Sequence, residues 1–151
     1  MDSHLNTSSW KWDQGPIGRI VKIAYSTLRR EVEKELKPFG LTHTQWNALG
    51  VLHYFPGITS SELELILMIE RPSVTSLMNG LEKKQLIVRK NYSGDARYKQ
   101  IFLTADGEKM ATETQYITRL VEDRVKAGFS DEEFETLKNQ LIKLVNLFEE
   151  K

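Results

Sequence analysis

Cationic residues are concentrated in one stretch of this chain of 151 residues, between positions 71 and 99. That stretch has an excess of five positive charges, although the chain as a whole has a formal net charge of zero. Local positive charge in an otherwise neutral protein is typical of a surface that contacts nucleic acid phosphates. The cations are Arg71, Lys83, Lys84, Arg89, Lys90, Arg97 and Lys99.

Short hydrogen-bonding side chains lie among the first of these cations, on one face of an expected helix. The buried face of this helix is indicated by apolar residues at helical spacing, namely Val74, Leu77, Met78 and Leu81. Pro72 suits the first position of such a helix because its missing amide would be unpaired there. The opposite face carries Ser73, Thr75, Ser76, Asn79 and Lys83. Hydroxyls and an amide can approach base edges and phosphate oxygens closely, but an ordinary solvated face explains this helix equally well.

A β-hairpin is expected directly after this helix. Strand-like runs at 86–88 and 100–103 enclose the turn-rich segment 91–95, and Arg89, Lys90, Arg97 and Lys99 flank the turn. Asp95 lies two residues before Arg97 and could hold its guanidinium extended. A pre-positioned arginine suits a narrow minor groove, where the potential is most negative. A plain surface salt bridge is the alternative interpretation.

A shorter helix before the polar face completes a helix-turn-helix. Thr59 and Glu62 have the spacing of a capping box, in which each side chain accepts the other residue's backbone N–H. Apolar residues then fall on one helical face, at Leu63, Ile66 and Leu67. We expect a helix-turn-helix at about 60–83 and a wing at about 86–103. This order predicts a winged helix-turn-helix, with one helix in the major groove and the hairpin in the adjacent minor groove.

Long helices are expected on both sides of this unit. The apolar period predicts helices over 17–37, 106–126 and 131–148. A capping box at Ser130/Glu133 marks the start of the last of these, and another at Thr42/Gln45 marks the start of a further helix. The fold class is therefore mostly α (α+β), in a single domain of residues 1–151. The last helix has apolar residues at spacings of three and four, at Phe134, Leu137, Leu141, Leu144 and Phe148.

Such a seam packs against another helix, and the two ends of the chain lack an obvious partner within so small a protein. We therefore expect a homodimer formed by residues 1–40 and 105–151. Residues 41–104, the expected DNA-binding unit, are called the reader. Trp10 and Trp12, in an otherwise polar segment, indicate that the N-terminus docks on the following helix or on the partner.

Residues for other kinds of chemistry are absent or isolated. The chain has no cysteine, so it can form neither a disulfide nor a thiolate metal site. His4, His43 and His53 lack neighbours at metal-ligand spacing, and no nucleophile elbow or phosphate-binding loop occurs. We expect no enzyme, no metal and no cofactor. There is no apolar run of about 18 residues and no signal-peptide core, which predicts a cytoplasmic protein with no membrane contact.

Three motifs follow one another in the reader: Leu81-Glu82-Lys83-Lys84-Gln85-Leu86-Ile87, Asp95-x-Arg97 and Leu103-Thr104-x-x-Gly107. In this order and spacing they resemble the MarR family of bacterial transcriptional regulators. The segments 41–46 and 69–73 are most similar to its SlyA-like branch. The family usually has glycine at the position of Gln85 and often a second arginine at that of Ala96. Gln85 therefore leaves the exact turn into the wing open, and Ala96 removes one possible phosphate contact per wing.

This resemblance implies a dimer that binds double-stranded DNA at a pseudo-palindromic operator and, commonly, a small phenolic or aromatic carboxylate effector. Tyr25, Trp46 and His53 are the expected effector contacts, near the junction between the long helices and the reader. Plain core packing explains these aromatics equally well. The main rival function is a protein–protein interaction module whose winged helix no longer binds DNA. A small enzyme or metal-dependent switch is disfavoured by the missing active-site groups.

Overall fold

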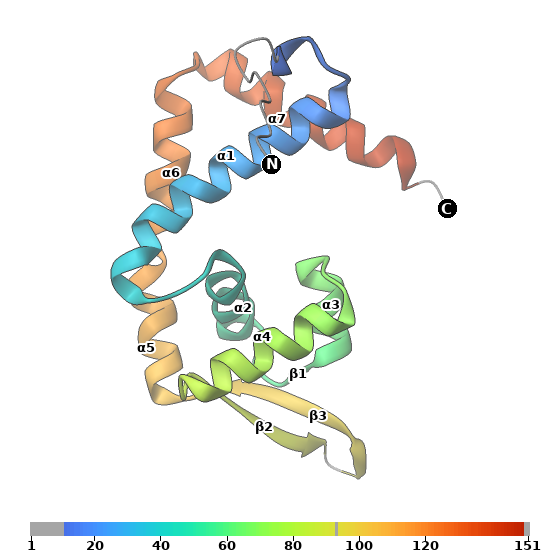
Figure 1. Ribbon diagram of the computed structural model, residues 1–151, viewed down its shortest axis with the longest axis vertical. Helices are drawn as coiled ribbons and strands as arrows, with labels where there is room; N and C mark the ends of the chain where they lie inside the picture. Colours follow the sequence, from blue (N-terminus) through green and yellow to red (C-terminus); the bar gives the residue numbers. More distant parts are fainter. Residues whose placement is uncertain (1–10, 93, 150–151) are drawn as a thin grey trace, which may run out of the picture.

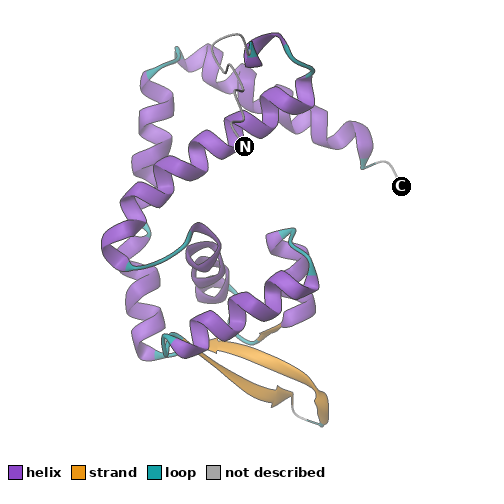
Figure 2. Cartoon of the chain, in the orientation of Figure 1, coloured by secondary structure: helices purple, strands orange, loops and turns teal. Residues whose placement is uncertain are grey.

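A computed structural model describes residues 11–92 and 94–149 of the protein. The structure is mostly helical with one small antiparallel sheet, which confirms the predicted fold class (Figure 2). The wing lies at one end of the molecule, and α1 and α7 lie at the opposite end (Figure 1). In chain order, the elements are η2 (Trp12–Gln14), α1 (Ile17–Leu36), η3 (Lys37–Phe39), α2 (His43–Tyr54), β1 (Ile58–Thr59), α3 (Ser60–Leu67), α4 (Arg71–Lys83), β2 (Ile87–Tyr92), β3 (Asp95–Leu103), α5 (Ala105–Thr114), α6 (Tyr116–Ala127) and α7 (Asp131–Phe148).

The predicted helix starts are confirmed by their capping hydrogen bonds. At the start of α3 the backbone N–H of Thr59 donates to the Glu62 carboxylate at 2.8 Å, and the Glu62 N–H donates to the Thr59 hydroxyl at 3.3 Å. The same reciprocal pattern begins α2, at Thr42 and Gln45, and α7, at Ser130 and Glu133. Each box satisfies amides that would otherwise have no intrahelical partner, so these helix starts are encoded locally.

The helix-turn-helix consists of α3 and α4, which pack against α2 and the base of the sheet. The four apolar residues predicted for the inner face of α4 are all buried. Two details differ from the predictions. Pro72 is the second residue of α4, because Arg71 already has helical geometry after the N-cap Glu70. Ile66 is 48% exposed, since only Leu63 of α3 reaches the core fully.

The sheet contains one strand more than the sequence indicated. β2 and β3 form the wing, and the two-residue β1 pairs with β3 through Ile58 opposite Ile101. A strand of two residues has no detectable sequence period, so it could not be predicted. Its pairing places the loop after α2 next to the wing base, where the Gly57 N–H donates to the Ile101 carbonyl at 2.9 Å.

The single helix predicted over 106–126 is instead two helices, α5 and α6, which meet at Gln115. The buried Thr114 hydroxyl donates to the Met110 carbonyl at 2.8 Å, a back-bond that commonly bends helices. The Trp46 indole Nε1 donates to the Thr114 carbonyl at 3.3 Å. The prediction was wrong because apolar spacing reveals neither this back-bond nor the indole contact from α2, 68 residues earlier in the sequence.

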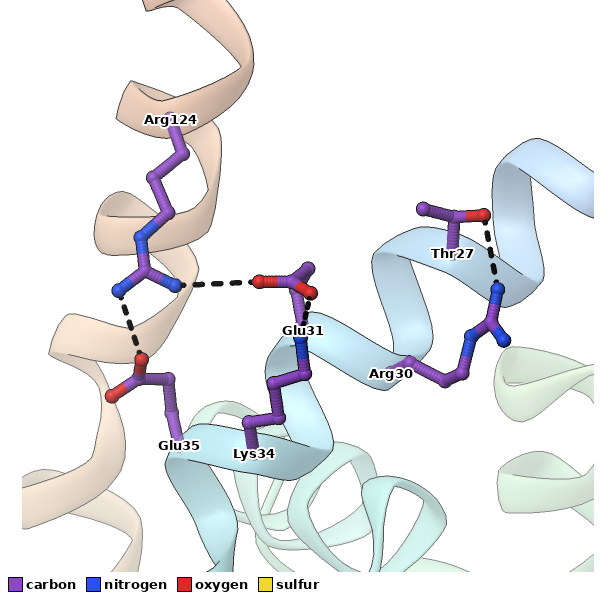
Figure 3. Close-up of polar contacts among 6 residues, drawn as sticks. All are labelled: Thr27, Arg30, Glu31, Lys34, Glu35 and Arg124. Carbon is purple, nitrogen blue, oxygen red and sulfur yellow. Dashed lines mark hydrogen bonds and ion pairs between the residues drawn. The ribbon is translucent and has the colours of Figure 1, made fainter.

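An arginine of α6 joins this helix to α1. Arg124 donates to Glu35 at 3.0 Å and lies 3.6 Å from a Glu31 oxygen, and both acids belong to α1 (Figure 3). Lys34 lies against Glu31 from the same helix and, by hydrogen bonding and charge, lowers the pKa of that carboxyl. The group ties the two long helices together at a point remote from the wing.

The turn between α4 and the wing is a Schellman motif centred on Gln85. The Leu86 N–H donates to the Leu81 carbonyl at 3.0 Å, and the Gln85 N–H donates to the Glu82 carbonyl at 2.9 Å. Gln85 has a φ of 60°, in the left-handed region that favours glycine. The turn therefore has left-handed geometry at a residue with a Cβ, at the position where the resembled family usually has glycine.

Replacing Gln85 with glycine is expected to stabilise the protein by about 0.5–1 kcal/mol. The left-handed conformation costs an L-residue with a Cβ about 1 kcal/mol, and part of the gain is lost to the greater freedom of glycine in the unfolded chain. Urea unfolding at fixed protein concentration measures the difference, with Gln85→Ala as the matched control that should not stabilise. An unchanged midpoint for Gln85→Gly would show that the turn carries no strain.

Candidate nucleic-acid interface

The polar face of α4 is solvent-exposed along its length. Its expected contacts are all exposed, in contrast to the buried apolar face of the same helix: Ser73, Thr75, Ser76, Asn79 and Lys83. The Thr75 hydroxyl also donates to the Arg71 carbonyl at 3.2 Å, which leaves its oxygen lone pairs available. Arg71 lies at the start of the helix, 80% exposed and 3.7 Å from Glu64. This face of α4 is therefore open to solvent from Arg71 to Lys83.

The wing holds Arg97 in the arrangement that its spacing from Asp95 predicted. The Arg97 Nε donates to Asp95 Oδ1 at 3.0 Å, and a terminal nitrogen donates to Oδ2 at 2.8 Å. The backbone N–H of Arg97 donates to the same carboxylate at 3.0 Å. These bonds from Arg97 lower the pKa of Asp95, and the carboxylate raises the pKa of Arg97. The Arg97 side chain is 83% exposed, so Asp95 orients it without burying it.

Lys90 and Lys99 extend the cationic surface along the two strands of the wing. Both are exposed. The Lys90 ammonium lies 5.2 Å from the centre of the Phe102 ring, within range of a cation–π contact. Lys84 is also exposed, but its ammonium donates to the Gly40 carbonyl and, at 2.9 Å, to the Gln45 side chain.

Arg89 differs most from its expected role as a phosphate contact. Its side chain is only 26% exposed, and its guanidinium pairs with the Glu82 carboxylate. The same guanidinium nitrogen donates to the Asn79 side-chain oxygen at 3.2 Å. Arg89 therefore links the exposed face of α4 to the base of the wing. Sequence reasoning missed this link because the residues are seven and ten positions apart, in different elements.

The expected effector residues are only partly brought together. Trp46 and His53 line an open pocket of about 730 Å³ between α2 and the α5–α6 break, together with Tyr54, Tyr116 and Arg119. Tyr25 does not line this pocket; it packs edge-on against His43 at 6.2 Å between ring centres, and His43 in turn lies 6.0 Å from Trp46. Burial lowers the pKa of His43, as expected for an imidazole within an aromatic cluster.

Polar groups at the pocket margin are hydrogen-bonded to one another. His53 Nδ1 lies 2.7 Å from Glu108, and the Gln115 amide donates to the Tyr54 hydroxyl at 3.3 Å. The pocket therefore contacts both α5, the helix that follows the wing, and the break between α5 and α6. A molecule bound there would touch the junction between the reader and the long helices.

Other kinds of site are not indicated by the described residues. Within 11–92 and 94–149, no three His, Asp or Glu side chains gather in a way that could hold a metal ion. In the same ranges, no helix has the length and apolar character needed to cross a membrane. His4 and Trp10 lie outside the described residues. Trp12 is 47% exposed and shares a groove on α1 with Ile23.

Comparison with known proteins identifies the family. A sequence profile of the MarR family matches residues 39–97, from η3 to the wing. The S. aureus MepR–DNA complex has 26% sequence identity and a TM-score of 0.83, over 89% of this chain and 100% of that chain. A mutant of E. coli MarR complexed with operator DNA has 22% identity and a TM-score of 0.80, over 85% and 93% of the two chains. A MarR transcriptional regulator from Methanosarcina mazei Go1 has 22% identity and a TM-score of 0.76, over 86% and 94%. Residues 39–97 therefore match the MarR family, and the chain as a whole has the fold of these MarR and MepR structures.

Proposed function

We propose that the protein is a homodimeric, sequence-specific DNA-binding regulator that recognises a pseudo-palindromic operator. The observation that carries this proposal is the shared exposure of the polar face of α4 and the Asp95-oriented Arg97. A helix face for the major groove and an extended arginine for the minor groove belong to one continuous unit. MepR and E. coli MarR have been solved with DNA on the same fold.

In this proposal each group has a separate task. The hydroxyls and amide of α4 read base edges, Arg97 enters the minor groove, and the exposed lysines neutralise phosphates: Lys83, Lys90 and Lys99. Phosphate contacts provide most of the affinity and its salt dependence, whereas base contacts provide the discrimination between sequences. Arg71 lies at the helix start, where it can reach the backbone flanking the groove.

Dimerisation is supported by the apolar surface of the long helices. No described residue of α7 is buried, and its exposed large apolar residues are Leu137, Leu141, Ile142, Val145, Leu147 and Phe148. On α1, Ile17 and Leu28 are also exposed. Apolar patches of this kind are typical of protein interfaces, and two α7 helices of a symmetric pair would cover each other. Two readers about 34 Å apart would then meet successive major grooves.

Two measurements test this function. Sedimentation velocity at micromolar concentration should give a dimer, and a fluorescent random duplex in low salt should bind with an affinity that falls steeply as salt rises. A stable monomer would refute the dimer. Absence of any binding in low salt would favour the rival interpretation, a protein–protein interaction module.

A small aromatic anion is the proposed effector, and the pocket between α2 and the α5–α6 break is its proposed site. Aromatic side chains would cover the ring, and Arg119 supplies a cation at the lining. Binding changes DNA affinity only if the ligand prefers one separation of the two readers. We propose that the ligand has this preference because its site contacts both sides of the α5–α6 break.

Benzoate at constant ionic strength is therefore expected to weaken duplex binding several-fold, while benzamide, its neutral counterpart, has less effect. Arg119→Gln should remove the difference between the two, and Trp46→Ala should remove both responses. Unchanged duplex affinity at millimolar benzoate would contradict the proposed effector class.

A further inference from the structure

The contact between the wing base and α4 fixes one particular group, the Asn79 side-chain amide. A guanidinium has only N–H donors, so the Asn79 atom that faces Arg89 at 3.2 Å must be the oxygen Oδ1. The amide group is planar, so Nδ2 then points away from Arg89. Asn79 is exposed, and its Nδ2 donors therefore face the solvent on the surface that the proposed function assigns to DNA.

Glu82 keeps this arrangement in place. Its carboxylate pairs with the guanidinium of Arg89 from one helical turn beyond Asn79, so both α4 side chains contact the same arginine. The pair also compensates the charge of Arg89, which is three-quarters buried. Without the carboxylate, the arginine would be free to turn outward and Asn79 would lose its restraint.

We propose that Glu82, acting through Arg89, is a positioning residue that makes Asn79 a hydrogen-bond donor to the major groove. The inference rests on the proposed function. Guanine presents two acceptors in that groove, N7 and O6, and thymine presents O4. The bidentate contact to adenine needs an acceptor and a donor that point together at the base. Although Oδ1 has a second lone pair, Arg89 holds this oxygen toward β2. Asn79 therefore prefers guanine or the thymine O4 and makes no use of the adenine amino group.

The test is a selection of bound duplexes from a random pool by four proteins in parallel: wild type, Asn79→Ala, Glu82→Gln and the control Glu122→Gln. Glu122 is an exposed acid of α6, remote from the wing, so its variant matches the charge change. We expect Asn79→Ala to lose base preference at one position per half-site. Glu82→Gln should lose about tenfold preference at that position. Its salt slope, the slope of log affinity against log salt concentration, should steepen by about one per subunit because Arg89 becomes available to a phosphate. Glu122→Gln should match the wild type.

A second variant and a base analogue separate positioning from general damage. Arg89→Lys should relax the same base preference without steepening the salt slope, because the charge is kept but the paired geometry is lost. If the position contains adenine, replacing it with purine, which lacks the amino group, should leave wild-type affinity unchanged. Thermal unfolding confirms that each variant folds.

The outcomes distinguish this inference from the proposed function. If the wild type enriches no sequence, the proposed function fails and the inference fails with it. If the wild type enriches an operator but Glu82→Gln keeps both its base preference and its salt slope, only the positioning role is overturned. Loss of wild-type affinity on removing the adenine amino group would overturn the donor orientation of Asn79.

Discussion

Replacing Arg97 with alanine is expected to weaken binding to the selected operator by about 10- to 100-fold, the range for losing a well-placed arginine contact in a groove. The guanidinium donates to both oxygens of Asp95 and the Arg97 side chain is 83% exposed, so we expect little conformational freedom to be lost when it enters the DNA. Pre-orientation of this kind lowers the entropic cost of binding. Fluorescence anisotropy with the operator, at several salt concentrations, measures the loss.

The matched controls divide this effect into charge and geometry. Lys109→Ala removes one positive charge from α5, where the side chain is exposed, and should change affinity less than twofold. Asp95→Asn keeps Arg97 but weakens the bonds that orient it, so the loss should be smaller than for Arg97→Ala and accompanied by lower specificity. An Arg97→Ala protein with unchanged operator affinity would remove the wing from the recognition mechanism.

Gly107→Ala is expected to destabilise the protein by about 3 kcal/mol or to prevent folding. A Cβ at this position would lie 2.0 Å from the carbonyl oxygen of Leu86 and 3.2 Å from a Leu103 methyl. That carbonyl cannot easily move, because it accepts the Thr104 N–H at 3.0 Å. Overpacking against fixed backbone is among the most costly core changes. The turn after α4 and the start of α5 would be forced apart.

Gly50→Ala is the control for this prediction. Gly50 lies within α2, and no atom outside its own helix backbone and chain neighbours comes within 4 Å of the Cβ that alanine would add. The substitution should leave stability unchanged or raise it by up to about 1 kcal/mol, because alanine is the better helix former. Chemical denaturation of both variants at equal concentration checks the difference. Equal stability of the two would show that α5 and the turn can separate without cost.

Features encoded by neighbouring residues were predictable from the sequence. The capping boxes at Thr42, Thr59 and Ser130, the buried face of α4 and the Asp95–Arg97 pair depend on spacings of two to seven residues. Each of them depends on residues close together in the sequence, and the structure contains each of them. The assignment to the SlyA-like branch stays a prediction.

Features that depend on distant contacts were not predictable. The Trp46 indole reaches the break between α5 and α6 from α2, and Arg89 pairs with two side chains of α4. Apolar spacing cannot show that Ile66 is half-exposed, and a strand as short as β1 has no period in the sequence that would predict it. The cation count could not show that Lys84 and Arg89 donate hydrogen bonds to other residues of the same chain.

Hydroxyl-radical footprinting of the protein on its selected duplex tests most directly whether a two-fold symmetric dimer binds one DNA molecule with both of its winged helices. The account predicts two protected half-sites related by symmetry, with centres about one helical turn apart, and flanking protection where each Arg97 enters the minor groove. Protection of a single unrepeated patch, or of no defined sequence, would contradict it.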